Sequence, residues 1–218
     1  MKIGQRVIDK HSPTFIIAEL SANHNGSIET ALETIKAARE AGADCVKFQT
    51  YTPDTITLDH RSEHFKISQD TIWDGKYLYD LYKEAYTPWE WHKELFEACS
   101  NEGLIYFSSP FDITAVDFLE NLNVPAYKIA SFEITDIPLI EYAASKMKPM
   151  IISTGIASIE DIQLAIDTCR NVGNNEIALL KCTSNYPAPL DQSNLSMIKD
   201  FSEKFDVIPG LSDHTAVS

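Results

Sequence analysis

The sequence lacks any apolar run long enough to cross a membrane. Its longest runs, such as Phe15-Ile16-Ile17-Ala18 and Met150-Ile151-Ile152, fall far below the roughly 20 residues that a bilayer-spanning helix needs. No sustained apolar stretch follows Met1-Lys2-Ile3-Gly4-Gln5-Arg6, which is therefore unlike a secretory signal. We expect a cytoplasmic protein with no membrane partner.

Cysteine is scarce, and its spacing excludes two further classes of protein. The 4 Cys residues are Cys45, Cys99, Cys169 and Cys182, and no two of them form a Cys-x-x-Cys pair. A disulfide framework or a zinc cage needs closer and more regular spacing. We therefore interpret all four as reduced structural thiols.

Positive charge is also in short supply. The 218 residues include 18 Lys and Arg against 32 Asp and Glu, which gives a formal net charge of -14. A surface with this charge repels nucleic-acid phosphates, so we expect no nucleic-acid partner. Any anion that the protein binds must meet a local cluster of cations. With 44% hydrophobic residues, the composition is that of an ordinary globular protein of one domain or slightly more.

Short runs rich in Ile and Val alternate with longer stretches of helical periodicity, a pattern typical of repeated βα units and a parallel sheet. No Gly-x-Gly-x-x-Gly turn is present, which disfavours a dinucleotide-binding sheet. The pattern favours an α/β fold, the TIM-type (β/α)8 barrel, with one strand fewer than eight. Since such barrels run about 250 residues, we expect residues 1–218 to be a barrel domain truncated after strand seven. The predicted strands are 15–20, 45–50, 104–109, 126–131, 150–154, 177–183 and 207–212.

Capping residues predict the helices between these strands. Ser27 precedes the stretch 28–41 and Gly42 follows it, while Ser158 opens a helix that ends near Gly173. The other predicted helices are 89–101, 113–121, 138–147 and 195–205. The segment 51–86 is an insertion after the second strand, interpreted as a substrate-covering loop with a short helix or as a surface excursion with its own hydrophobic staple.

Polar side chains gather at the carboxyl ends of all seven predicted strands, where a parallel barrel opens its active site. An isolated Lys in a hydrophobic strand is costly unless it is paired. Glu19 or Glu133 could pair with the lysines, a bound phosphate or carboxylate could do so, or Lys128 could form a Schiff base as in aldolases. These polar residues are Glu19, Lys47, Gln49, Ser108, Ser109, Lys128, Ser131, Glu133, Ser153, Thr154, Lys181, Thr183, Ser212, Asp213 and His214.

Two histidines are candidates for chemistry. His214 at the end of strand seven is a metal ligand or a structural hydrogen bonder. His24, in the first βα loop, is an acid/base or substrate-contact candidate, with loop packing as the alternative. We interpret the others, His11, His60, His64 and His92, as surface residues.

Seven motifs, in order along nearly the whole chain, resemble the sialic acid synthase family. The first is Ile16-Ile17-Ala18-Glu19-Leu20-Ser21-Ala22-Asn23-His24-Asn25-Gly26-Ser27, and the second is Ala43-Asp44-Cys45-Val46-Lys47-Phe48-Gln49-Thr50. The others span 107–111, 127–133, 153–155, 181–187 and 210–214. Residues 50–54 and 86–92 resemble the pseudaminic acid branch of this family, whose acceptor is a diacetamido-trideoxy-altrose. Acceptors that give N-acetylneuraminic or legionaminic acid are the alternatives.

The resemblance implies a reaction and a site. Such enzymes condense phosphoenolpyruvate with the open-chain aldehyde of an acetamido sugar and release phosphate, which favours the bound anion over the Schiff base. The resemblance implies catalytic roles for Glu19, Glu133 and Lys128, and it makes His214 one of two His ligands for a divalent metal, usually Mn²⁺. The matching phosphoenolpyruvate positions are Lys47, Lys128, Ser131, Ser153, Ser184 and Ser212, and the sugar-binding positions are Gln49, Asn185, Tyr186 and Asp213.

The chain departs from the family in two ways. Ser184 stands where sialic acid synthases commonly have Asn. Family members also continue into an eighth strand with the second metal His and into an antifreeze-like domain, which we expect to be absent from residues 1–218. The resemblance implies a homodimer. The alternative to a synthase is an inactive barrel fragment that binds ligands or assembles with another chain.

Overall fold

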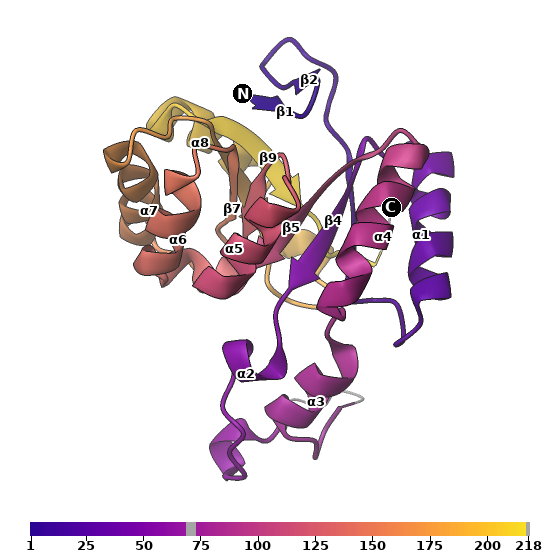
Figure 1. Cartoon of the computed structure of the whole chain (residues 1–218). Coiled ribbons are helices and arrows are strands. Elements are labelled where there is room, and N and C mark those ends of the chain that lie inside the picture. Colours follow the sequence, from indigo (N-terminus) through magenta and orange to yellow (C-terminus); the bar gives the residue numbers. More distant parts are fainter. Residues whose placement is uncertain (69–72, 217–218) are drawn as a thin grey trace. The chain divides into compact units, whose positions relative to one another are not determined.

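The computed structural model describes residues 1–68 and 73–216. These residues form two compact units, one made of residues 15–122 and the other of residues 1–14 and 123–218 (Figure 1). We call them the three-stranded unit and the four-stranded unit, after their parallel strands.

The three-stranded unit contains β3 (Ile17–Ser21), β4 (Cys45–Thr50) and β5 (Ile105–Pro110), which pair in parallel in this order. Its main helices are α1 (Ile28–Glu40), α4 (His92–Asn101) and α5 (Ile113–Asn121). The Ser27 hydroxyl accepts a hydrogen bond from the Thr30 N–H and so caps α1, as the sequence predicts. The buried residues Val46, Phe48 and Phe107 place the core on these strands.

The segment between β4 and α4 forms the predicted insertion with helices, α2 (Pro53–Ile56), the 3₁₀ helix η1 (Glu63–Phe65) and α3 (Leu78–Ala85). A further 3₁₀ helix, η2 (Trp89–Trp91), leads into α4. The buried Tyr51 ring makes edge contacts with Tyr82 and Phe111, at centroid distances of 5.7 and 5.4 Å. This insertion is therefore fixed to its own unit by a small aromatic cluster.

The four-stranded unit contains β6 (Tyr127–Ile129), β7 (Met150–Ser153), β8 (Ile177–Cys182) and β9 (Ile208–Ser212), in this order with β6–β7, β7–β8 and β8–β9 parallel. The helices α6 (Ile137–Ser145), α7 (Ile159–Asn171) and α8 (Ser196–Phe205) connect them. Short 3₁₀ helices, η3 (Ser131–Thr135) and η4 (Leu190–Gln192), follow β6 and β8. The predicted Ser158 cap of α7 is a reciprocal capping box with Asp161.

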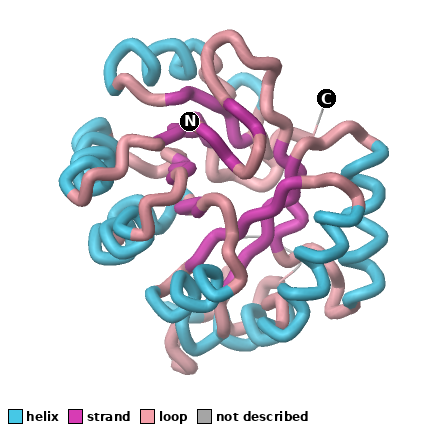
Figure 2. Tube along the Cα trace, turned by 45° about the horizontal axis from the view of Figure 1, so that its top comes forward, coloured by secondary structure: helices cyan, strands magenta, loops and turns pink. Residues whose placement is uncertain are grey.

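In both units the main helices pack along the outer side of the strands (Figure 2). The predicted polar residues lie in these strands or in the segments that follow their carboxyl ends. The predicted strands agree with the observed ones to within about two residues, the uncertainty inherent in such boundaries. The antiparallel pair of β1 (Lys2–Ile3) and β2 (Arg6–Val7) was not predicted. No helix among the described residues is long and apolar enough to span a membrane.

Candidate functional site

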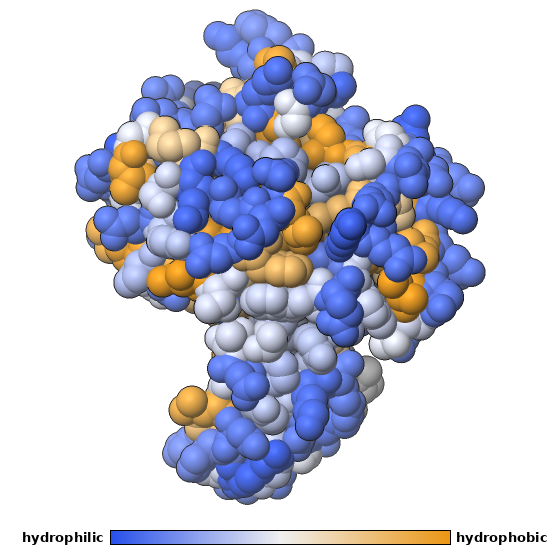
Figure 3. Space-filling view, in the orientation of Figure 1, coloured by the Kyte–Doolittle hydropathy of each residue, from blue (hydrophilic) through white to orange (hydrophobic). Residues whose placement is uncertain are grey.

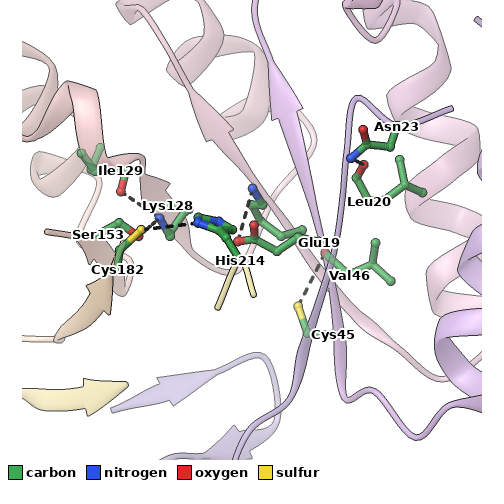
Figure 4. A network of polar contacts seen from close by, with 11 residues as sticks. Glu19, Leu20, Asn23, Cys45, Val46, Lys128, Ile129, Ser153, Cys182 and His214 are labelled. Atoms are coloured by element: carbon green, nitrogen blue, oxygen red, sulfur yellow. Dashed lines mark hydrogen bonds and ion pairs between the residues drawn. The ribbon is translucent and has the colours of Figure 1, made fainter. Parts of the chain in front are cut away.

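In the three-stranded unit, Lys47 forms an ion pair with Glu19. The parallel register places the two residues opposite each other, and Lys47 Nζ lies 3.4 Å from Glu19 Oε1. Glu19 lies within β3, two residues before its end, and is labelled in Figure 4. Lys47 is buried, with 5% exposure, whereas the Glu19 side chain is 35% exposed. Lys47 is therefore paired with an internal carboxylate, one of the three partners predicted for a buried lysine. Because Glu19 is partly exposed, a ligand could reach it from solvent.

The two serines near the end of β5, Ser108 and Ser109, lie on opposite faces of the strand and differ in their hydrogen bonds. Gln49 is opposite Ser109, and Ser109 Oγ is buried with no hydrogen-bond partner among residues 1–68 and 73–216. Ser108 lies on the other face of the strand, where its hydroxyl contacts Thr50 Oγ1 at 2.7 Å. A buried hydroxyl without a partner is costly unless a ligand or water satisfies it. Ser109 is thus a candidate ligand contact that was predicted only as a polar strand end.

Both histidines buried in this unit serve the packing of loops and helices. His24 Nε2 lies 3.1 Å from Thr87 Oγ1, and its Nδ1 accepts the Gly26 N–H at 3.1 Å. Burial lowers the pKa of His24, so the loop-packing interpretation is the one that its contacts support. The prediction that His92 is a surface residue is wrong, because His92 is fully buried. Its position on the inner side of α4 was not visible in the sequence pattern around Trp91.

In the four-stranded unit, Lys128 is held at the end of β6. Its Nζ donates hydrogen bonds to Ser153 Oγ at 2.5 Å and to the Ile129 carbonyl at 3.0 Å (Figure 4). Lys128 is 4% exposed and Ser153 is 2% exposed. This pair therefore places a buried amino group and a hydroxyl in the same region.

Glu133 lies in η3, just after β6. Its Oε2 is buried and has no hydrogen-bond partner in the part of the chain that the structure describes. Burial raises the pKa of Glu133, and the nearby charge of Lys128 opposes part of this rise. A buried carboxyl group with a raised pKa is a candidate for proton transfer in a reaction.

A cluster of small polar groups surrounds Gly155, just after β7. The Gly155 N–H donates to Ser131 Oγ at 3.1 Å, and Cys182 Sγ lies 3.9 Å from Ser184 Oγ and 3.8 Å from His214 Nδ1. Burial by itself raises the pKa of the Cys182 thiol, but hydrogen bonds from His214, Ser131 and Ser184 bring it down to about 7. The sequence predicts this thiol as an ordinary core residue, because its partners Ser131 and His214 lie far from it along the chain.

His214 has the contacts of an oriented imidazole. Its Nδ1 donates to the Thr183 carbonyl at 3.0 Å, which leaves the lone pair on Nε2, the arrangement that metal-binding histidines commonly show. The Tyr186 ring lies 4.3 Å from the His214 ring. Among the described residues, however, no group of three or more His, Cys, Asp or Glu side chains could hold a metal ion. These residues alone do not make a manganese site.

The remaining predicted residues lie on the loops after β8 and β9. Asn185 Nδ2 contacts Gln192 Oε1 at 3.4 Å, and the exposed Asp213 accepts hydrogen bonds from Thr215 at 3.0 and 3.1 Å. Ser212 ends β9 and is half-buried. Their proposed contacts with a sugar or with phosphoenolpyruvate remain predictions.

Lys181 differs from the other two strand-end lysines. Its Nζ donates to the Cys182 carbonyl at 3.1 Å, to Thr183 Oγ1 at 2.6 Å and to the Gln192 carbonyl at 3.2 Å. Three acceptors satisfy all the donors of an ammonium group. Lys181 therefore ties the loop after β8 to η4.

Comparisons with known proteins agree on one family. Residues 34–218 match the model of the NeuB family. The chain is 52% identical over 203 residues to the pseudaminic acid synthase of Helicobacter pylori, which covers 93% of this chain and 59% of that protein. It is 48% identical over 215 residues to the pseudaminic acid synthase of Campylobacter jejuni, which covers 99% of this chain and 62% of that protein. The chain thus spans about three fifths of the length of these relatives.

Solved structures show the same relationship. The spore coat polysaccharide biosynthesis protein SpsE of Bacillus subtilis superposes with a TM-score of 0.82 at 36% identity, covering 99% of this chain and 57% of that one. The N-acetylneuraminic acid synthetase of Leptospira borgpetersenii gives 0.87 at 30% identity, covering 99% and 70%. These neighbours and the parallel strands of both units confirm the predicted TIM-barrel-type α/β fold.

Proposed function

Because this chain belongs to the NeuB family, we propose that it acts in the condensation of phosphoenolpyruvate with an open-chain acetamido sugar to a nonulosonic acid, with release of phosphate. The observation that carries the proposal is the buried cation Lys128 with the hydroxyl of Ser153, close in sequence to the raised-pKa carboxyl of Glu133. A buried amino group beside a hydroxyl, at the carboxyl end of a parallel strand, offers the donors that a bound phosphate or carboxylate needs.

We further propose the diacetamido-trideoxy-altrose as the acceptor, which makes the product pseudaminic acid. The support is similarity, because the N,N'-diacetyllegionaminic acid synthase of Legionella pneumophila is less identical to this chain, at 38%. Acceptors of the N-acetylneuraminic and legionaminic acid synthases are the alternatives that the experiment below separates.

In the proposed reaction, carbon three of phosphoenolpyruvate attacks the aldehyde carbon of the sugar. Water then adds to the cation at carbon two, and the tetrahedral intermediate expels phosphate. Lys128, Ser131, Ser153 and Ser184 hold the negative charges of phosphoenolpyruvate, and Ser212 and Lys47 are proposed as further ligands. Glu133 moves the proton of the attacking water, since its carboxyl group is buried and has no competing hydrogen bond at Oε2 within the described residues. Glu19, the ion-pair partner of Lys47, is proposed as the second catalytic carboxylate. Gln49, Asn185, Tyr186 and Asp213 are proposed sugar contacts.

The Schiff-base alternative, in which Lys128 attacks a carbonyl as the neutral amine, predicts an adduct that borohydride traps, whereas the proposed condensation forms none. Manganese, a homodimer and a cytoplasmic location also belong to the proposal, with His214 as one metal ligand. Since His214 alone does not hold an ion, we derive no step through a metal. We propose residues 1–218 as a synthase barrel domain.

The test measures phosphate release from phosphoenolpyruvate with each of the three acceptor sugars and without sugar, with Mn²⁺ and with a chelator. We expect release with the diacetamido-altrose alone, and mass spectrometry should show the nine-carbon acid. Release with another sugar would reassign the acceptor. Absence of release with every sugar would contradict the synthase proposal and favour a binding module.

Two variants test the residues. Lys128→Met should weaken phosphoenolpyruvate binding at least about 30-fold, because truncating one partner of a buried charge pair costs about 2–5 kcal/mol. Glu133→Gln should retain binding and lower kcat about 100-fold or more. Lys199→Met is the matched control, since Lys199 is exposed on α8. Unchanged phosphoenolpyruvate affinity in Lys128→Met, measured by calorimetry, would remove the central claim.

A further inference from the structure

Gly155 lies where three polar side chains of the four-stranded unit converge. A Cβ atom at this position would overlap Ser184 Oγ, and it would lie 2.8 Å from Ser131 Oγ and 3.2 Å from Cys182 Sγ. Real Cβ atoms essentially never lie closer than 3.0 Å to a neighbour, so the contacts with Ser184 and Ser131 would force a shift, and the contact with Cys182 would be tight. These side chains come from η3, from the end of β8 and from the loop after it, so only a residue without a side chain lets all three meet here.

The backbone of Gly155 is fixed by its neighbour. The N–H and the hydroxyl of Thr154 both donate to the Leu180 carbonyl, at 3.2 and 3.0 Å. The last residue of β7, Ser153, pairs with Leu180 in the parallel register. An added methyl group at residue 155 therefore cannot be accommodated by moving the backbone, and the side chains of Ser184 and Ser131 would have to rotate away.

Gly155 also determines the direction of the Ser131 hydroxyl. Because Ser131 Oγ accepts the Gly155 N–H at 3.1 Å, the proton of Ser131 points away from Gly155, on the side where Cys182 Sγ lies. Ser184 Oγ also contacts Cys182 Sγ, at 3.9 Å, so the two hydroxyls converge on one point. An oxyanion that enters there is a stronger acceptor than a thiol and would take both protons.

We propose that Gly155 is a positioning residue of the phosphoenolpyruvate site: its missing side chain lets the hydroxyls of Ser131 and Ser184 donate together to one oxyanion. This inference rests on the proposed function, since it takes phosphoenolpyruvate as the anion. It predicts that residues 155 and 184 are coupled through their size, so that a methyl group at residue 155 acts through Ser184.

The experiment is a double-mutant cycle of Gly155→Ala and Ser184→Gly. Phosphoenolpyruvate affinity is measured by calorimetry, and KM for each substrate by phosphate release. Gly155→Ala should weaken phosphoenolpyruvate binding about 10- to 100-fold, the loss of a hydrogen bond to a charged group, with KM for the sugar nearly unchanged. In the Ser184→Gly background, where the overlapping hydroxyl is gone, the same substitution should cost less than about 3-fold.

Gly210 supplies the matched control, because a Cβ there would lie 2.5 Å from Leu180 Cδ2, an apolar atom. Gly210→Ala should lower the Tm and leave phosphoenolpyruvate affinity unchanged. An equal cost of Gly155→Ala in both backgrounds, or wild-type affinity in Gly155→Ala, would overturn the proposal. Where Ala fits both the backbone and its surroundings, Gly→Ala slightly raises the free energy of unfolding, because it reduces the conformational freedom of the unfolded chain.

Inorganic phosphate separates this proposal from the proposed function. Phosphate binding to each variant of the same cycle is measured as the rise in Tm that phosphate produces. Binding of phosphate without binding of phosphoenolpyruvate would refute the proposed function, and the cycle would still test Gly155. Binding of neither anion by the wild-type chain would overturn both.

Discussion

At the scale of single residues, His92 shows how a titratable group can be buried without being catalytic. Its Nδ1 donates to the Pro88 carbonyl at 3.3 Å, so Nε2 accepts a hydrogen bond from Thr50 Oγ1 at 2.9 Å. Thr50 Oγ1 in turn contacts Ser108 Oγ at 2.7 Å. This chain of hydrogen bonds joins α4 to the ends of β4 and β5, and it needs the neutral imidazole.

The pKa of His92 predicts how stability depends on pH. Burial lowers this pKa to about 4, against the usual 6.5. Between these values the unfolded chain binds a proton that the folded chain does not, so the free energy of unfolding falls as pH decreases from 6.5 toward 4. The neutral His92 contributes about 3 kcal/mol to the free energy of unfolding. This contribution is fully present above pH 6.5 and is lost as the pH falls to about 4. Urea unfolding of the wild type should show this slope, and His92→Gln should have a flatter profile.

The control for this slope is His11→Gln, since His11 is exposed in the other unit. It should follow the wild-type profile. Parallel profiles for His92→Gln and the wild type would show that His92 does not carry the effect. Burial also lowers the pKa of His24. His24 therefore contributes to the pH dependence of stability in the same direction, and some slope should persist in His92→Gln.

At the scale of elements, the loop after β8 depends on Lys181 for its conformation. We expect Lys181→Met to leave the Gln192 carbonyl and Thr183 Oγ1 without this donor and to lower the free energy of unfolding by about 1–3 kcal/mol. Amide hydrogen exchange should become faster in residues 183–192, while β7 stays protected. Lys199→Met serves as the control. Unchanged exchange in 183–192 would mean that other contacts hold the loop.

The elements themselves were largely predictable, because their signals are local. The caps Ser27 and Ser158 correctly mark the starts of α1 and α7, and α5 has its predicted bounds. The predicted strand 126–131 ends early at Ile129, since Ser131 already begins η3. The polar strand ends were visible for the same reason. The contacts of Cys182 were not, because its partner His214 lies 32 residues away in sequence.

At the scale of the whole molecule, charge is the dominant global property. The surplus of 14 acidic groups destabilises the compact state by self-repulsion. Hydrophilic side chains cover most of the face seen in Figure 3. Surface ion pairs such as Lys199–Glu203, at 3.5 Å, offset little of this repulsion, because exposed pairs contribute at most about 1 kcal/mol.

Salt should therefore stabilise the fold. Raising NaCl from about 0.01 M to about 0.1 M shortens the screening length from about 30 to about 10 Å. We expect the Tm to rise by about 2–4 °C, which corresponds to about 1 kcal/mol for a chain of this size. Tetramethylammonium chloride should raise the Tm equally, because screening does not depend on the cation. A fall in Tm with both salts would mean that the surface ion pairs outweigh the net repulsion.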